Sequence, residues 1–153
     1  MAIFLVQHGK SLSKEQDPEQ GLSQQGIDEV KRIGAVAKGY SVPVKSIVHS
    51  VKKRARQTAE IFASAFQPTG GVQEMEGLKP LDDVTVFAET LKSGSQLMVV
   101  GHLPFMERLT SFLITGDINC PVFRFQNGGI VCMEEGPDGK GWVIKWTLMP
   151  EIG

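Results

Sequence analysis

The sequence has no apolar run of the length that a membrane span requires, and it carries almost no net charge. It opens with Met1-Ala2-Ile3-Phe4, without the basic segment and apolar core of an export signal. No apolar run approaches the ~20 residues of a transmembrane helix. The 16 Lys and Arg residues are balanced by 17 Asp and Glu residues, so the net charge is −1. These absences argue against membrane and nucleic-acid partners and predict a cytoplasmic protein.

Cysteine is also scarce, and its two positions exclude the common sulfur-based sites. Cys120 and Cys132 fit neither a CxxC motif nor the spacing of a zinc site. In a chain without an export signal we expect both to be reduced thiols. Cys132 lies in an apolar run, which predicts that its side chain belongs to the hydrophobic core.

Apolar runs alternate with segments of helical periodicity, and this alternation predicts an α/β fold. The length of 153 residues suits one domain over residues 1–153. The turn signal Pro137-Asp138-Gly139 predicts a C-terminal β-hairpin. We expect strands at 3–7, 45–49, 96–101, 122–125, 129–134 and 142–148, one short strand within 72–81, and helices at 24–39 (capped by Ser23), 52–66, 82–92 (capped by Asp82 or Asp83) and 104–115.

Two of the three histidines each close an apolar run. Residues 3–7 lead into His8, and residues 97–101 lead into His102. Short runs rich in Val, Ile and Leu are typical of parallel strands that are buried on both faces. In open α/β sheets, ligands bind beyond the carboxyl ends of such strands. We therefore expect His8 and His102 to share one site.

Four cations, Lys52, Lys53, Arg54 and Arg56, fall in the first turns of the predicted helix 52–66. The helix dipole already makes this end positive, so cations there are mildly destabilising. A helix start that is both dipole-positive and basic suits an anion such as phosphate, with Arg54 as the first candidate ligand. The alternative interpretation is a solvated basic face, which is what most runs of charge form.

Four short motifs occur in order over residues 1–110: Leu5-Val6-Gln7-His8-Gly9, Leu22-Ser23-Gln24-Gln25-Gly26, Ser50 to Ala59, and Val100-Gly101-His102. They resemble the RHG, L-[ST]-x-x-G, S-x-x-x-R-A-x-Q-T and second-histidine motifs of the histidine phosphatase superfamily, the phosphoglycerate mutase-like proteins. The small size is similar to the SixA-type phosphohistidine phosphatase branch. The resemblance implies a three-layer sandwich, with a mostly parallel central sheet and helices on both faces.

The resemblance also implies a mechanism. His8 would be the nucleophile and would form a phosphohistidine on the protein, while Arg54 and His102, the latter as imidazolium, would hold the phosphoryl oxygens. Gly9 suits a tight strand exit where backbone approaches the phosphate. Water would then release inorganic phosphate. We expect neither a metal nor another cofactor.

Gln7 departs from the family pattern, which usually has Arg at this position. Its amide still donates hydrogen bonds but carries no charge, and charge-assisted bonds are roughly twice as strong as neutral ones. Lys10 could supply the missing cation to the phosphate. The alternative is that Lys10 is an ordinary loop lysine.

The general acid is predicted as Asp82 first and Glu76 second, because Leu78-x-Pro80-x-Asp82 resembles a loop pattern of SixA-like proteins. Helix capping alone would also explain Asp82. His49 ends the predicted strand 45–49 and could line the rim of the pocket, or it could face sideways within the sheet.

The predicted function is a metal-independent phosphatase that acts on protein phosphohistidine, so the expected partner is a phosphorylated protein. Only about fifteen residues separate the Arg54 helix from the next helix, so any lid over the site must be small. One alternative is an enzyme on small phosphoesters, either a phosphomonoesterase or a phosphoglycerate-mutase-like protein. A third interpretation is a phosphate-binding scaffold without activity, in which Gln7 has weakened the site.

Overall fold

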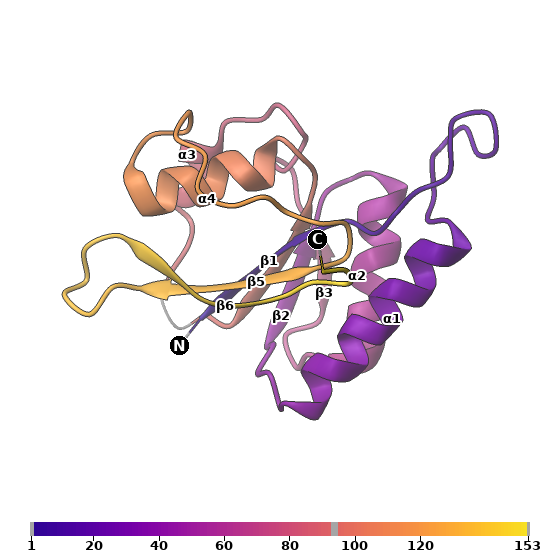
Figure 1. Ribbon diagram of the computed structural model, residues 1–153, viewed down its shortest axis with the longest axis horizontal. Coiled ribbons are helices and arrows are strands. Elements are labelled where there is room, and N and C mark those ends of the chain that lie inside the picture. Colours follow the sequence, from indigo (N-terminus) through magenta and orange to yellow (C-terminus); the bar gives the residue numbers. More distant parts are fainter. Residues whose placement is uncertain (1, 93–94, 153) are drawn as a thin grey trace.

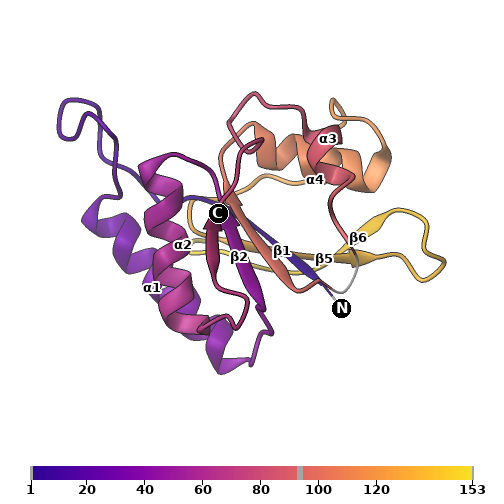
Figure 2. The ribbon, with the colours of Figure 1, turned by 180° about the vertical axis from the view of Figure 1, so that it is seen from behind.

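The apolar runs predicted as strands form the centre of one mixed sheet in the computed structural model, which describes residues 2–92 and 95–152. Figures 1 and 2 show this sheet between two layers of helices. The elements are β1 Ile3–Gln7, α1 Gln24–Gly39, β2 Ser46–His49, α2 Lys53–Phe66, β3 Val72–Glu74, α3 Val84–Ala88, β4 Leu97–Gly101, α4 Phe105–Thr115, β5 Ile130–Glu135 and β6 Trp142–Leu148.

The strand order is β3-β2-β4-β1-β5-β6. The first four strands in this order run parallel, while β5 is antiparallel to both β1 and β6. The carboxyl ends of β1, β2 and β4 therefore meet at one edge of the sheet. The hairpin that was predicted for the end of the chain is confirmed as β5–β6.

Alternate residues of β1 face opposite layers. Phe4 and Val6 belong to the core cluster beneath α1 and α2, whereas Ile3 and Leu5 belong to the cluster beneath α3 and α4. All four side chains are 0–1% exposed. A strand that is buried on both faces must be apolar throughout. The predicted three-layer α/β sandwich is confirmed.

Two predicted elements were wrong. Residues 122–125 form no strand: the Phe125 N–H donates to the Glu107 carboxylate at 3.0 Å, and the rings of Phe123 and Phe125 pack edge to face. The helix expected to reach Lys92 ends at Ala88, because the chain then turns and the Thr90 hydroxyl donates to the Phe87 carbonyl.

The predictions for the helix caps and the cysteines agree with the structure. The Ser23 hydroxyl accepts from the Gly26 N–H at the start of α1, and Asp83, not Asp82, caps α3 through the Thr85 N–H. Cys132 is buried, Cys120 is exposed, and both are free thiols. In the part of the chain that the structure describes, no helix is long and apolar enough to cross a membrane.

The start of α1 lies directly against the backbone that follows His8. A Cβ added at Gly26 would overlap the carbonyl oxygen of Lys10, whereas a Cβ at Gly39, in the same helix, would meet nothing within 4 Å. We expect Gly26→Ala to lower the free energy of unfolding by about 1–3 kcal/mol through overpacking. Gly39→Ala should be neutral or stabilising by up to about 1 kcal/mol. Urea unfolding of both variants measures the difference, and equal stability would contradict this contact.

Candidate active site

The pairing of β1 with β4 brings the two predicted histidines together. Gln7 lies opposite Gly101 in the parallel ladder, and the His8 N–H donates to the Gly101 carbonyl at 2.9 Å. The next residue on each strand is then a histidine. The ring centroids of His8 and His102 lie 5.1 Å apart, and His102 is only 2% exposed.

The His8 ring is fixed by a bond to its own neighbour. Its Nδ1 lies 2.7 Å from the Gly9 carbonyl oxygen. A carbonyl oxygen can only accept, so Nδ1 carries the hydrogen and Nε2 keeps a free lone pair when the ring is neutral. Burial lowers the pKa of His8 to about 4; the bond to Gly9 opposes this shift, and the Arg54 cation adds to it. His8 is therefore neutral at pH 7.

His102 contacts the end of β2. Its Nε2 lies 2.6 Å from the Ser50 hydroxyl, and its buried Nδ1 has no hydrogen-bond partner among the described residues. Burial lowers the pKa of His102 to about 3, and repulsion contributes from His8, which is protonated at the low pH where His102 titrates, and from the cations Arg54 and Lys52. The imidazolium expected from the sequence is thus not the form of the free protein at pH 7. An anion beside the ring would favour protonation.

Arg54 differs from Lys53 and Arg56 in its ion pairs, whereas Lys52, the exposed fourth cation, has none among the described residues either. Lys53 contacts Asp17 at 2.9 Å and Arg56 contacts Glu60 at 3.8 Å, whereas in the described ranges Arg54 forms no ion pair. Burial lowers its pKa. Its charge lowers the pKa of both His8 and His102, so it acts on both rings. The cluster thus divides: Lys53 and Arg56 fit the interpretation as a solvated face, and Arg54 fits the anion site.

Gln7 and Lys10 flank the His8–Gly9 pair. The Gln7 carbonyl accepts from the Gly128 N–H at 2.8 Å. The Lys10 ammonium lies 2.9 Å from Glu151 and 3.4 Å from Glu29, and these contacts raise its pKa. The ammonium is therefore held by carboxylates, and compensation for Gln7 by Lys10 stays a prediction.

Among the described residues, no hydrogen bond or ion pair joins His49, Asp82 or Glu76 to the ring of His8 or His102. His49 is 5% exposed, and its Nδ1 donates to the Ser50 carbonyl at 2.8 Å. Asp82 accepts from the Lys79 N–H at 2.8 Å and lines, with Glu76, a cavity of about 390 Å³ between β3 and α3. Neither His8 nor His102 lines this cavity. The acid roles of Asp82 and Glu76 and a rim role for His49 remain predictions.

Three residues that were not predicted as site residues hold the backbone around His8 or contact the His102 ring. The Thr58 hydroxyl accepts from the Gly9 N–H at 2.9 Å and donates to the Arg54 carbonyl at 2.8 Å. The Asn127 amide donates to the His8 carbonyl at 2.9 Å. Ser50, the third, contacts His102. Ser50 and Thr58 stand within the motif around Arg54, which was the available signal, whereas Asn127 belongs to none of the four motifs and stands in an Asn-Gly-Gly stretch that is typical of a turn.

The family profile described as histidine phosphatase superfamily (branch 1) matches residues 3–82, a range that holds His8 and Arg54. This chain belongs to the histidine phosphatase superfamily. A search of curated protein sequences found no significant match.

Solved structures that resemble this histidine phosphatase superfamily protein cover nearly all of it. The protein histidine phosphatase SixA, complexed with tungstate, has a TM-score of 0.80 at 24% identity, over 98% of this chain and 97% of that chain. A protein of Agrobacterium tumefaciens assigned as the phosphohistidine phosphatase SixA has a TM-score of 0.77 at 21% identity, over 97% of each chain. An Escherichia coli protein assigned as an α-ribazole-5′-phosphate phosphatase has a TM-score of 0.76 at 17% identity, over 100% of this chain and 99% of that chain. At these identities the likeness establishes a common fold.

The two depressed histidine pKa values can be measured directly. We expect the imidazole resonances of His8 and His102 to titrate near pH 4 and 3 instead of 6.5. In Arg54→Ala both midpoints should rise, by roughly half a unit to one unit, because a repelling cation is removed. Lys53→Ala should leave them in place, since Lys53 is paired with Asp17. Unshifted midpoints in Arg54→Ala, followed by NMR, would contradict the placement of Arg54.

The lowered pKa values of His8 and His102 also predict how the stability of the protein depends on pH. Unfolded histidines titrate near 6.5, so as the pH falls from 6.5 toward 4 the unfolded chain binds protons that the folded chain excludes. The free energy of unfolding should therefore fall over this range and not change through these two groups above it. Urea unfolding at pH 7, 5.5 and 4.5 measures this trend, which a flat profile would contradict.

Because the Thr58 hydroxyl bridges Gly9 and Arg54, we expect Thr58→Val and Thr58→Ser to differ in stability. Thr58→Val keeps the shape but leaves the buried Gly9 N–H unpaired, which should cost about 1–3 kcal/mol of stability. Thr58→Ser keeps the hydroxyl and should cost less than half as much. Denaturant unfolding of both variants tests this, and an equal loss would assign the effect to packing.

Proposed function

We propose that this protein is a phosphatase that forms a covalent phosphohistidine on His8. The observation that carries the proposal is the bond from His8 Nδ1 to the Gly9 carbonyl, because it leaves Nε2 free to attack. Its pKa of about 4 keeps the ring neutral, and therefore nucleophilic, at pH 7. The adjacent Arg54 cation attracts the phosphoryl group that the nucleophile attacks.

The proposed reaction has two displacements at phosphorus. In the first, the Nε2 lone pair forms an N–P bond in line with the bond to the leaving group, which departs with its electron pair. Arg54 and a ring N–H of His102 stabilise the charge on the remaining oxygens. In the second, a water oxygen bonds to phosphorus, the N–P bond breaks and its electrons return to Nε2. The water proton passes to solvent, and inorganic phosphate leaves.

The charges around the two histidines favour a leaving group that needs no strong acid. The ionisable groups that shift their pKa values are all basic: Arg54 for both rings, and also His8 and Lys52 for His102. The Asp82 carboxylate is held on the Lys79 N–H. A phosphohistidine releases an imidazole, which takes a proton readily near neutral pH. We therefore propose protein phosphohistidine as the substrate and a phosphorylated protein as the partner.

Access to the site supports a macromolecular substrate. Between the end of α2 at Phe66 and the start of α3 at Val84, the chain forms only the three-residue strand β3 and turns. This connection contains no inserted helix that could cover the strand ends. A phosphorylated side chain on a folded protein could therefore reach His8, and small phosphoesters are the competing substrates.

A trapping experiment tests the covalent step. The protein is incubated with a generic aryl phosphate at saturating concentration and quenched in base, and phosphate that stays on the chain is measured. We expect a base-stable, acid-labile label in wild type and none in His8→Ala. His49→Gln should keep the label, because His49 is only 5% exposed, whereas His8 is only partly buried, so a phosphoryl group reaches His8 and not His49. A label that persists in His8→Ala would contradict the proposal.

Two further outcomes separate the alternatives. The value of kcat/KM should be at least about tenfold higher for a phosphohistidine protein than for sugar phosphates, and the reverse order would favour a small-molecule phosphatase. Phosphate binding without any label or turnover would favour the inactive scaffold.

A further inference from the structure

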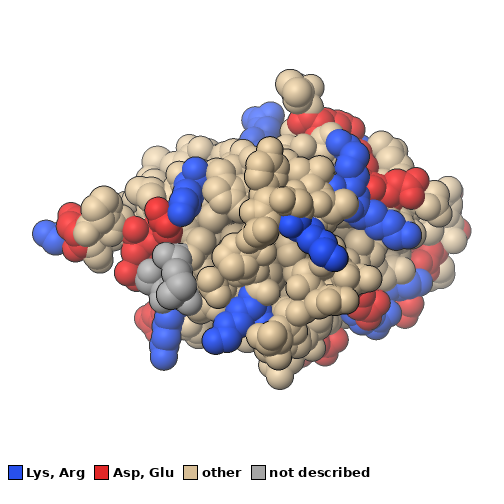
Figure 3. Space-filling view, turned by 90° about the horizontal axis from the view of Figure 1, so that it is seen from below, with Lys and Arg blue, Asp and Glu red and all other residues tan. Residues whose placement is uncertain are grey.

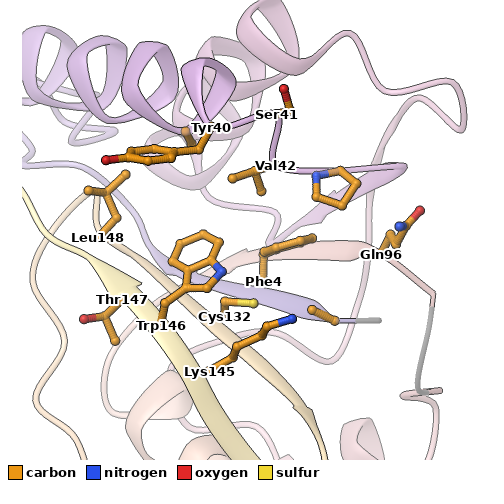
Figure 4. Close-up of a pocket in the computed structure, with 13 residues that line it drawn as sticks. Phe4, Tyr40, Ser41, Val42, Gln96, Cys132, Lys145, Trp146, Thr147 and Leu148 are labelled. Carbon is orange, nitrogen blue, oxygen red and sulfur yellow. The ribbon is translucent and has the colours of Figure 1, made fainter.

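A second cavity lies near the amino-terminal ends of β1 and β4, whereas His8 and His102 follow the carboxyl ends of these strands. Neither histidine lines this cavity. Its volume is about 720 Å³, and its walls come from the start of β1, the turn after α1, the residue before β4, and β6 (Figure 4). Phe4, which lines it, precedes His8 by four residues, so an extended strand separates the two sites by ~13 Å. We call it the Trp146 cavity.

The inner part of the Trp146 cavity is apolar and its walls are aromatic. Phe4 and Cys132 are each 1% exposed, and burial raises the pKa of the Cys132 thiol to about 11, so it stays uncharged. The Trp146 ring lies 6.1 Å from that of Phe4. Tyr40, across from them in Figure 4, is 81% exposed. These three rings suit a flat, apolar body.

A β-bulge directs Trp146 into this cavity. Cys132 pairs with Trp146, but the next residue, Met133, pairs with Ile144, so Lys145 is an extra residue in β6. Before the bulge, Ile144 faces the core beneath α3 and α4; after it, Trp146 faces the core beneath α1 and α2. Bulges re-aim side chains in this way beside functional sites. Without the bulge, Trp146 would lie on the other face.

Lys145 is the charged residue of the cavity lining, all of which lies in the described ranges. Its side chain is 55% exposed, and its ammonium lies 3.5 Å from the Glu134 carboxylate. Figure 4 shows the side chain running beside Cys132 beneath the Phe4 ring. Figure 3, which views the edge that holds the strand starts, shows Lys and Arg on a largely uncharged centre and most acidic side chains toward the margins. Lys145 can meet a bound anion, because its contact with Glu134 is longer than the 2.9 Å contacts that hold Lys10 and Lys53.

Two lining residues have a backbone conformation that non-glycine residues rarely adopt. Ser41 has φ of 56° and Gln96 has φ of 52°. A left-handed conformation costs such residues about 1 kcal/mol or more, and it persists where the surrounding structure holds it. Both carry hydrogen-bonding side chains at the cavity wall.

We propose that the Trp146 cavity binds a small planar aromatic molecule that carries one anionic group. The ring lies between Tyr40 and the Trp146–Phe4 pair, and the anion meets Lys145. The volume falls within the range of about 300–1,000 Å³ that is typical of small-molecule sites. The proposal does not depend on the phosphatase activity, because the cavity shares no residue with the candidate active site.

A matched pair of fluorescent probes tests this proposal: 1-anilinonaphthalene-8-sulfonate, which is an aromatic anion, and the neutral N-phenyl-1-naphthylamine. We expect the sulfonate to bind once per chain and to shift the indole N–H resonance of Trp146 but not that of Trp142. Lys145→Met should weaken the sulfonate about fivefold or more and change the neutral probe less than twofold. Tyr40→Ala, at a largely exposed position, should weaken both.

Two controls isolate the site. Lys140→Met, in the β5–β6 turn, removes one cation elsewhere and should leave both probes unchanged, and His8→Ala should bind them like wild type. In Lys145→Met, either an unchanged sulfonate affinity or an equal loss for both probes would overturn the proposal. In wild type, a shift of the Trp142 resonance in place of that of Trp146 would do the same. If the wild-type protein binds the probes as expected but forms no phosphate label, the result would count against the phosphatase proposal alone.

Discussion

The parallel pairing of β1 with β4 is the constraint on which the candidate active site depends. Its register sets Gln7 opposite Gly101, so the chain leaves both strands at the same level and the next residue of each is a histidine. A shift of one residue would turn every side chain of β1 to the other face. Burial of all four apolar residues Ile3–Val6 beneath two helix layers makes that shift costly. The packing of the core thus holds His8 beside His102.

The local electrostatics of this site differ from those of the chain as a whole. The protein is nearly neutral, yet the ionisable groups that shift the pKa values of His8 and His102 are all basic. Burial and repulsion keep both rings uncharged, so one can act as a nucleophile. The same repulsion is relieved when a phosphoryl group brings negative charge, because an anion offsets Arg54 and favours protonation of His102. The site therefore favours a bound anion, because the anion supplies the negative charge that is missing beside the two rings.

The two edges of the sheet differ in what they offer a ligand. The edge with His8 presents nitrogen donors and a cation, as an oxyanion requires. The opposite edge presents aromatic rings and Lys145, because α1 ends at Gly39 and leaves the Trp146 face of β6 partly uncovered. A single extra residue in β6 decides which side Trp146 occupies. One six-stranded sheet can thereby hold two sites of different chemistry.

Most elements, and the pairing of His8 with His102, could be read from the sequence, because apolar runs and helical periodicity are local signals and parallel strands end at a common edge. Caps such as Ser23 and the hairpin turn were local signals as well. Residues 122–125 were misread because their aromatic pattern reflects packing between Phe123 and Phe125, not a ladder. The contacts of Thr58 and Asn127, the ion pairs that hold Lys10, the position of Asp82 and the bulge at Lys145 were decided by tertiary structure. Each of these depends on which distant backbone group or charge comes within reach, and that distance is set only when the layers pack.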